Sequence, residues 1–188
     1  MLRPPVRSSH LPRGAMAAGA VFGLAWASAM RAMMAELAAR DPGGSHLGIA
    51  TFVFILPPGA VMGALMAWAL TPRQPGTTPP PARLRWAPMV MCLDPAALPI
   101  MLAVVGVGWV AAGRGTPRSR LGVGIPSSLA LLALPVAIAI SAPPVWASLR
   151  TAWILTLATS LLASLVVVET AVVRHVAAPA PAEQGVYP

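Results

Sequence analysis

Charged side chains are scarce in this sequence, and their scarcity excludes a water-soluble domain. Only 10% of the 188 residues are charged, whereas soluble domains carry about 25%. A soluble fold with so few charges could not cover its surface with polar groups. Hydrophobic residues make up 57% of the chain and gather in long runs. The sequence therefore predicts an all-α protein, a polytopic transmembrane helix bundle embedded in the lipid bilayer.

Lysine is absent, and cysteine occurs once. All 13 basic residues are arginines, and the formal net charge is +8. The arginines stand in short clusters between the apolar runs, which is typical of the positive-inside pattern rather than of a nucleic-acid-binding surface. We therefore expect no nucleic-acid partner. The single cysteine, Cys92, excludes an internal disulfide and a multi-cysteine metal site.

Familiar catalytic and metal-binding motifs are also missing. The sequence contains no P-loop, no H-E-x-x-H, no Cys-x-x-Cys and no G-x-S-x-G. Its histidines, His10, His46 and His175, lie in three separate parts of the chain without the spacing of metal ligands. We therefore expect no metal, no cofactor and no catalytic residues, and the sequence does not indicate an enzyme.

Five hydrophobic segments organise the chain. They cover residues 15–38, 47–70, 87–112, 121–142 and 149–173. The first segment would reach about 36 Å as a helix, which is enough to cross a hydrocarbon core of about 30 Å. A basic leader (1–14) precedes it, a proline-rich loop (71–86) follows the second segment, and an Ala/Pro-rich tail (174–188) is predicted to be disordered.

The leader and the first segment could instead form a cleaved signal peptide, because Ala27-Ser28-Ala29 matches a cleavage site. Two observations favour a retained first span. Its apolar run continues to Ala38, and four more hydrophobic segments follow. We therefore expect a multi-pass protein of the plasma membrane with a cytoplasmic N-terminus.

Small residues recur every four positions in the first two segments. Such spacing places them on one helix face, where a second helix can approach closely. The predicted helix-packing residues are Gly19, Gly23 and Ala27 in the first segment and Gly59, Gly63 and Ala67 in the second. A composition rich in Gly and Ala would also place small residues there without any contact. A third stripe of small residues, Ala152, Thr156, Ser160 and Ser164, is predicted to face the bundle.

The third segment is interrupted by Asp94-Pro95 and Pro99. It could be one kinked span, which gives five crossings, or a re-entrant hairpin, which gives four. With five crossings the twelve arginines outside the membrane divide seven to five between the two sides, and with four they divide ten to two. The positive-inside rule favours the hairpin, whereas the length of the segment favours a span.

Three charged residues are predicted to lie within the membrane. Arg31 could snorkel towards the outer headgroups or point inwards to bind an anionic group. Asp94 could cap a half-helix that begins at Pro95, or serve as a proton- or ion-coupling site. Glu169 stands five residues before Arg174, and we expect it at the membrane interface.

Short motifs around the first turn resemble an uncharacterised family of small multi-span membrane proteins from actinobacteria. They are Met30-Arg31, the Asp41-Pro42 turn, and Gly48 with Thr51 at the start of the second segment. The break from Pro95 to Pro99 is also similar to that family's third segment, although Leu47 replaces the aromatic residue usual before the glycine. The resemblance covers residues 14–112. It implies the architecture and no mechanism.

Three functions remain open at this level. The first is a structural or accessory bundle that binds a membrane-protein partner or another copy of itself. The second is a small transporter or channel that uses the broken third segment around Asp94. The third is an enzyme that acts on lipid headgroups through Arg31.

Overall fold

The computed structural model describes residues 13–38, 49–72, 80–140 and 149–177. In these residues every regular element is a helix, so the predicted all-helical class is confirmed. The elements are α1 (Arg13–Ala38), α2 (Ile49–Phe54), α3 (Leu56–Ala69), the 3₁₀ helices η1 (Ala82–Leu93) and η2 (Pro95–Ala97), α4 (Leu98–Ala111), α5 (Pro117–Ile140) and α6 (Leu149–Val176).

Three helices of the described chain, α1, α5 and α6, are long and apolar enough to cross a membrane. This number is smaller than the five segments that the sequence predicts. The difference arises in the second and third segments, where prolines divide the chain into shorter helices. The longest apolar helices there, α3 and α4, have 14 residues each.

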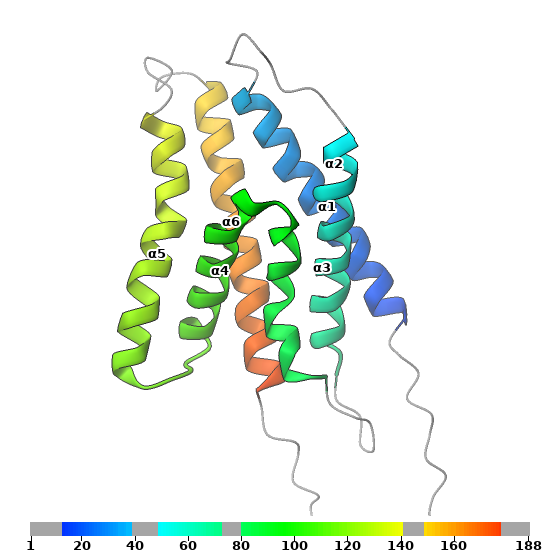
Figure 1. The fold of residues 1–188 in the computed structure, drawn as a ribbon, viewed down its shortest axis with the longest axis vertical. Coiled ribbons are helices and arrows are strands. Elements are labelled where there is room, and N and C mark those ends of the chain that lie inside the picture. The colour runs from blue at the N-terminus through cyan, green and yellow to red at the C-terminus, as the bar shows by residue number, and fades with distance from the viewer. Residues whose placement is uncertain (1–12, 39–48, 73–79, 141–148, 178–188) are drawn as a thin grey trace, which may run out of the picture.

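The helices run along the long axis of a bundle, and five chain features meet at one end of it (Figure 1). At this end α1 begins, α3 ends, η1 begins, α4 turns into α5, and α6 ends. We call it the arginine-rich end. The described arginine side chains that belong to these features are Arg13, Arg83, Arg85, Arg114, Arg118, Arg120 and Arg174.

The second segment breaks just before Pro57-Pro58. α2 ends at Phe54, and α3 begins at Leu56 with prolines in its first turn. A proline has no N–H group, and the first turn of a helix is where an N–H group would lack a partner in any case. The two prolines therefore fit the first turn of α3, and the same lack of N–H groups disfavours the continuation of α2 through them.

The third segment is a hairpin, so its interpretation as one kinked span is wrong. η1 rises from the arginine-rich end, the chain turns about midway along the bundle, and α4 returns beside η1 (Figure 1). Asp94 has extended backbone angles (φ −92°, ψ 112°), and Pro95 follows at once. The hairpin also begins earlier than predicted, since residues 82–86 belong to η1 and not to the proline-rich loop.

The turn from α4 to α5 needs glycine twice. Gly113 and Gly115 have φ of +77° and +81°, a region that side chains with a Cβ avoid. Arg120 holds this turn together, because its guanidinium group donates hydrogen bonds to the carbonyl oxygens of Gly113, Arg114 and Gly115. At least one arginine of this end is therefore structural.

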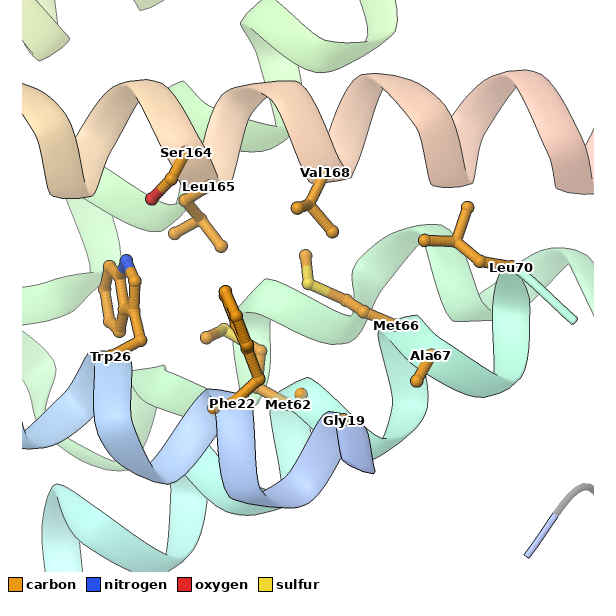
Figure 2. Close-up of a pocket in the computed structure, with 12 residues that line it drawn as sticks. Gly19, Phe22, Trp26, Met62, Met66, Ala67, Leu70, Ser164, Leu165 and Val168 are labelled. Carbon is orange, nitrogen blue, oxygen red and sulfur yellow. The ribbon is translucent and has the colours of Figure 1, made fainter. Parts of the chain in front are cut away.

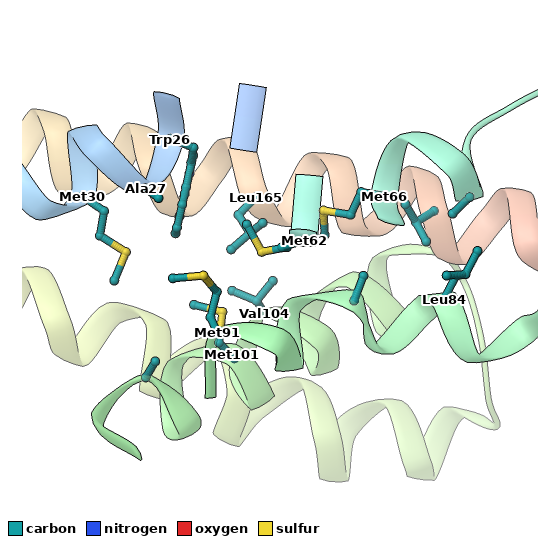
Figure 3. Close-up of a cluster of buried hydrophobic side chains, with 14 residues drawn as sticks. Trp26, Ala27, Met30, Met62, Met66, Leu84, Met91, Met101, Val104 and Leu165 are labelled. Carbon is teal, nitrogen blue, oxygen red and sulfur yellow. The ribbon is translucent and has the colours of Figure 1, made fainter. Parts of the chain in front are cut away.

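Methionine side chains fill the centre of the bundle (Figure 3). Met30 of α1, Met62 and Met66 of α3, and Met91 and Met101 of the hairpin are buried in one cluster with Trp26 and Leu165. Unbranched methionine side chains adapt to the irregular gaps between helices that cross at different angles. The cluster joins the hairpin to α1, α3 and α6.

The last two segments extend slightly beyond their predicted bounds. α5 begins at Pro117, and α6 continues to Val176. Arg174 and His175 are therefore helical, although the sequence assigns them to the tail. The rest of the predicted tail from residue 178, the leader up to residue 12 and the Asp41-Pro42 turn lie outside the described residues.

Candidate functional site: an apolar groove and a buried carboxyl group

The small residues of α1 and α3 lie directly against one another. A Cβ atom added to Gly23 would overlap the carbonyl oxygen of Gly59, and one added to Gly63 would lie 2.8 Å from the Cα of Gly23. Gly19 is equally close to Gly63 and Ala67, and Gly59 to Ala27. The two backbones thus touch along about two helical turns, from Gly19 to Ala27 on α1 and from Gly59 to Ala67 on α3. In lipid such packing stabilises a helix pair, because burial of apolar surface gives no gain there.

A groove of about 190 Å³ opens beside this pair, between α1, α3 and α6 (Figure 2). Its walls are apolar apart from two groups. Trp26 Nε1 and Ser164 Oγ both donate to the carbonyl oxygen of Leu161, at 3.1 Å and 2.9 Å. Neither donor is therefore available to hydrogen-bond a ligand. The lining comprises Gly19, Phe22, Gly23 and Trp26 of α1, Met62, Gly63, Met66, Ala67 and Leu70 of α3, and Ser164, Leu165 and Val168 of α6.

Two hydrogen bonds join the walls of the groove. The bond from Trp26 to Leu161 connects α1 to α6, and it explains a tryptophan midway along a membrane helix. Beyond Leu70 and Val168, His175 Nε2 lies 3.0 Å from the carbonyl oxygen of Thr71, which connects α6 to the end of α3. The second bond lies at the arginine-rich end.

The small polar stripe of α6 does not face the bundle, which corrects the prediction. Ala152, Thr156, Ser160 and Ser164 are all exposed. Thr156 and Ser160 donate to the carbonyl oxygens four residues earlier, at 2.8 Å and 2.7 Å. A hydroxyl group satisfied within its own helix needs no partner helix. Only Ser164 contributes to a described feature, the groove.

Arg31 and Asp94 are half-buried. Arg31 lies on α1, five residues after Trp26. Asp94 forms the turn of the hairpin, where its N–H group donates to the carbonyl oxygen of Met91 and its carbonyl oxygen accepts from the N–H group of Ala97. The main chain of Asp94 thus ends η1 and starts η2. Its neighbours on either side, Leu93 and Pro95, are exposed.

Glu169 is fully buried, although the sequence places it at the interface. Its exposed fraction is 0%, and neither carboxyl oxygen has a hydrogen-bond partner among the described residues. Arg174 does not pair with it, since Nη2 donates to the carbonyl oxygen of Ala111 at 2.8 Å. The buried positions of α6 include Leu165 and Val172. They lie on the same helix face as Glu169, but exposed positions such as Val167 are equally apolar, so the sequence alone does not mark this face.

The part of the chain that the structure describes contains no cluster of side chains that could bind a metal ion. No three His, Cys, Asp or Glu side chains come together there. No family model, curated protein or solved structure matches this chain. The groove and the buried carboxyl group are therefore interpreted from their geometry alone.

Proposed function

We propose that this protein is a multi-pass membrane protein that crosses the bilayer four times and carries a re-entrant hairpin. Three crossings are α1, α5 and α6, and the fourth is α2 together with α3. The hairpin of η1 and α4 enters and leaves from the cytoplasmic side. Broken backbone at membrane depth is tolerated where protein covers it, and the methionine cluster covers one face of this hairpin, while Leu93 and Leu98 at its turn are exposed.

The distribution of arginines supports a cytoplasmic arginine-rich end. Seven described arginines belong to that end of the bundle, and cytoplasmic loops of membrane proteins carry an excess of basic residues. The N-terminus of α1 and the C-terminus of α6 lie at this end (Figure 1). Both ends of the bundle sequence are therefore assigned to the cytoplasm.

We expect cysteine labelling to reproduce this topology. In a Cys92→Ser background, Thr116→Cys should react with an impermeant maleimide only in inside-out membrane vesicles, because the turn from α4 to α5 would be cytoplasmic. Reaction from the outer side only would show five crossings and contradict the hairpin in the membrane.

The function that the geometry supports best is binding, and the ligand we propose is an acyl chain of an anionic phospholipid. The observation that carries this proposal is the groove, whose only two polar side-chain groups are occupied by the Leu161 carbonyl oxygen. An apolar occupant is favoured because a polar one would lose hydrogen bonds to water without replacement.

The shape of the groove favours a chain over a partner helix. A helix with its side chains is about 10–12 Å across, whereas α1 and α6 converge on the bond from Trp26 to Leu161. The preference for an anionic headgroup follows from the arginine-rich end, where Arg13 begins α1 and Arg174 lies in the last turn of α6. A groove that holds a lipid acyl chain is consistent with an accessory subunit that senses membrane lipid or presents it to a partner.

Filling the groove should weaken lipid binding. Ser164 lines it, and Ser160 lies one turn earlier on α6, also exposed but outside it. We expect Ser164→Phe to weaken binding of phosphatidylglycerol at least about tenfold, or about 1.4 kcal/mol, in native mass spectrometry of the purified protein. Ser160→Phe is the matched control and should bind as the parent does.

Two outcomes would overturn parts of this proposal. Equal binding by Ser164→Phe and Ser160→Phe would remove the groove as the site. Equal affinity for phosphatidylcholine and phosphatidylglycerol would remove the anionic headgroup from the proposal. Circular dichroism of both variants should show the same helix content as the parent, so that lost binding reports the groove.

A second function, a transporter or channel around Asp94, is favoured by the position of the hairpin turn. The turn lies about midway along the bundle (Figure 1), where transporters bind their substrates. In the labelling experiment above, Asp94→Cys should then react with water-soluble reagents from at least one side. Lack of reaction from both sides would leave the lipid-binding bundle as the function.

A further inference from the structure

The carboxyl group of Glu169 is the one buried side chain in the described chain with both oxygens unpartnered. Both are inaccessible and without a hydrogen bond, and the whole residue is 0% exposed. Glu169 lies on α6, seven residues before the helix ends at the arginine-rich end. It belongs neither to the groove nor to the turn that carries Asp94.

Gly108 of the hairpin provides the space for this side chain. A Cβ atom on Gly108 would lie 2.6 Å from Cγ and 3.2 Å from Cβ of Glu169. The stem of the glutamate thus lies on the bare backbone of α4. This close contact keeps water from the carboxyl group, and it makes α4 the cover of the site.

No basic group described near this part of the bundle hydrogen-bonds Glu169. Arg114, in the turn after α4, has a buried Nε that itself lacks a hydrogen-bond partner. Helices α3 and α4 contain no ionisable side chain. Arg174 donates to Ala111, Arg120 donates within the turn from α4 to α5, and His175 lies against Thr71. The other charged or titratable side chains described on the elements that pack against α6 are Arg13, Arg31 and Glu36 of α1, Arg83, Arg85 and Cys92 of η1, and Arg118 of α5; none of them hydrogen-bonds Glu169.

An ionised carboxylate in this place would have lost its water without gaining a counter-charge or a donor. The neutral acid loses far less, because only polar and not ionic solvation is removed. A proton is also the one ligand that a single carboxyl group can bind without further ligands. We propose that Glu169 is an intramembrane proton-binding site, and that α4 covers it through the bare backbone of Gly108.

The cover has a mechanical consequence. Glu169 can release its proton only where water or a cation can replace it, so α4 must move away from α6 when the proton leaves. The hairpin is a short, separate element with a turn at each end, whereas α6 is a continuous helix of 28 residues. Protonation of Glu169 therefore couples to the position of the hairpin, independently of what the groove binds.

Infrared spectroscopy can observe the proton directly. The chain has three glutamates, Glu36, Glu169 and Glu183, so the double variant Glu36→Gln/Glu183→Gln leaves Glu169 alone. We would label its side-chain carboxyl with ¹³C and reconstitute the full chain in phosphatidylcholine bilayers near neutral pH. The expected spectrum contains the isotope-shifted C=O stretch of a carboxylic acid, with slow exchange in D₂O.

Each alternative spectrum overturns a defined part of the proposal. Labelled carboxylate bands near neutral pH would show that Glu169 is ionised and would overturn the proton site. An acid band that shifts at once in D₂O would show that α4 does not cover the group. Glu169→Gln in the same background must remove the labelled band, and a band that persists would overturn its assignment to Glu169.

Discussion

Replacing Gly23 with leucine is expected to force α1 away from α3 and to lower the free energy of unfolding by about 3 kcal/mol, the upper part of the usual range for overpacked sites. A Cβ atom at this position would overlap the Gly59 carbonyl oxygen and lie 3.0 Å from the Cα of Gly63. These are backbone atoms, which cannot rotate out of the way. Denaturant unfolding of the purified protein, followed by circular dichroism, measures the change.

Gly14 is the matched control for this substitution. It lies on the same helix, and a Cβ atom there would have no heavy atom within 4 Å. Gly14→Leu therefore gains the same helix propensity, about 1 kcal/mol at most, without a collision. If Gly23→Leu proved as stable as Gly14→Leu, the backbone contact between α1 and α3 would be contradicted.

The second large effect is expected at the contact of the hairpin with α6. Gly108→Ala introduces a Cβ atom 2.6 Å from Cγ of Glu169, so either the glutamate stem or α4 must shift. We expect a loss of about 1–3 kcal/mol in the free energy of unfolding, measured as for Gly23→Leu. Gly122→Ala on α5 is the control, because its added Cβ atom would meet nothing within 4 Å.

A double-mutant cycle separates this contact from a general intolerance of Gly108. Glu169→Ala removes the stem that the new methyl group would strike, so Gly108→Ala should cost less in that background. The interaction energy of the cycle is expected in the range of about 0.5–3 kcal/mol, as for residues in contact. Additive effects of the two substitutions would show that Glu169 does not lie on Gly108.

The contact between α1 and α3 is the part of the site that could be reasoned from residues alone. A short connection makes the first two segments neighbours, and Gly19, Gly23, Gly59 and Gly63 recur every four residues on them. Without a Cβ atom, glycine marks where backbones approach. The sequence could not show that α6 would form the third wall of the groove. No residue pattern within 149–173 indicates that this helix packs against α1.

Prediction was poorest for the orientation of α6. Thr156 and Ser160 look like an inward polar stripe, yet they are exposed and satisfied by their own helix. Glu169 looks interfacial, yet it is buried. In lipid both faces of a helix are apolar, so the contrast that identifies the inner face of a soluble helix is missing. The positions of a few polar residues do not replace it.

The sequence by itself indicated a membrane-embedded protein, its helical class and the break of the third segment at Asp94-Pro95. These follow from local physics, since backbone groups in a membrane must be satisfied within their own helix and a proline removes one of the donors. A proline does not break every helix, however, because α5 continues through Pro126 and Pro135. The tertiary structure alone decided that the chain reverses at Asp94, that α6 turns Glu169 inwards onto Gly108, and that α1, α3 and α6 leave a groove. These features depend on how side chains from distant segments fit together, and that fit is set by packing rather than by any local preference.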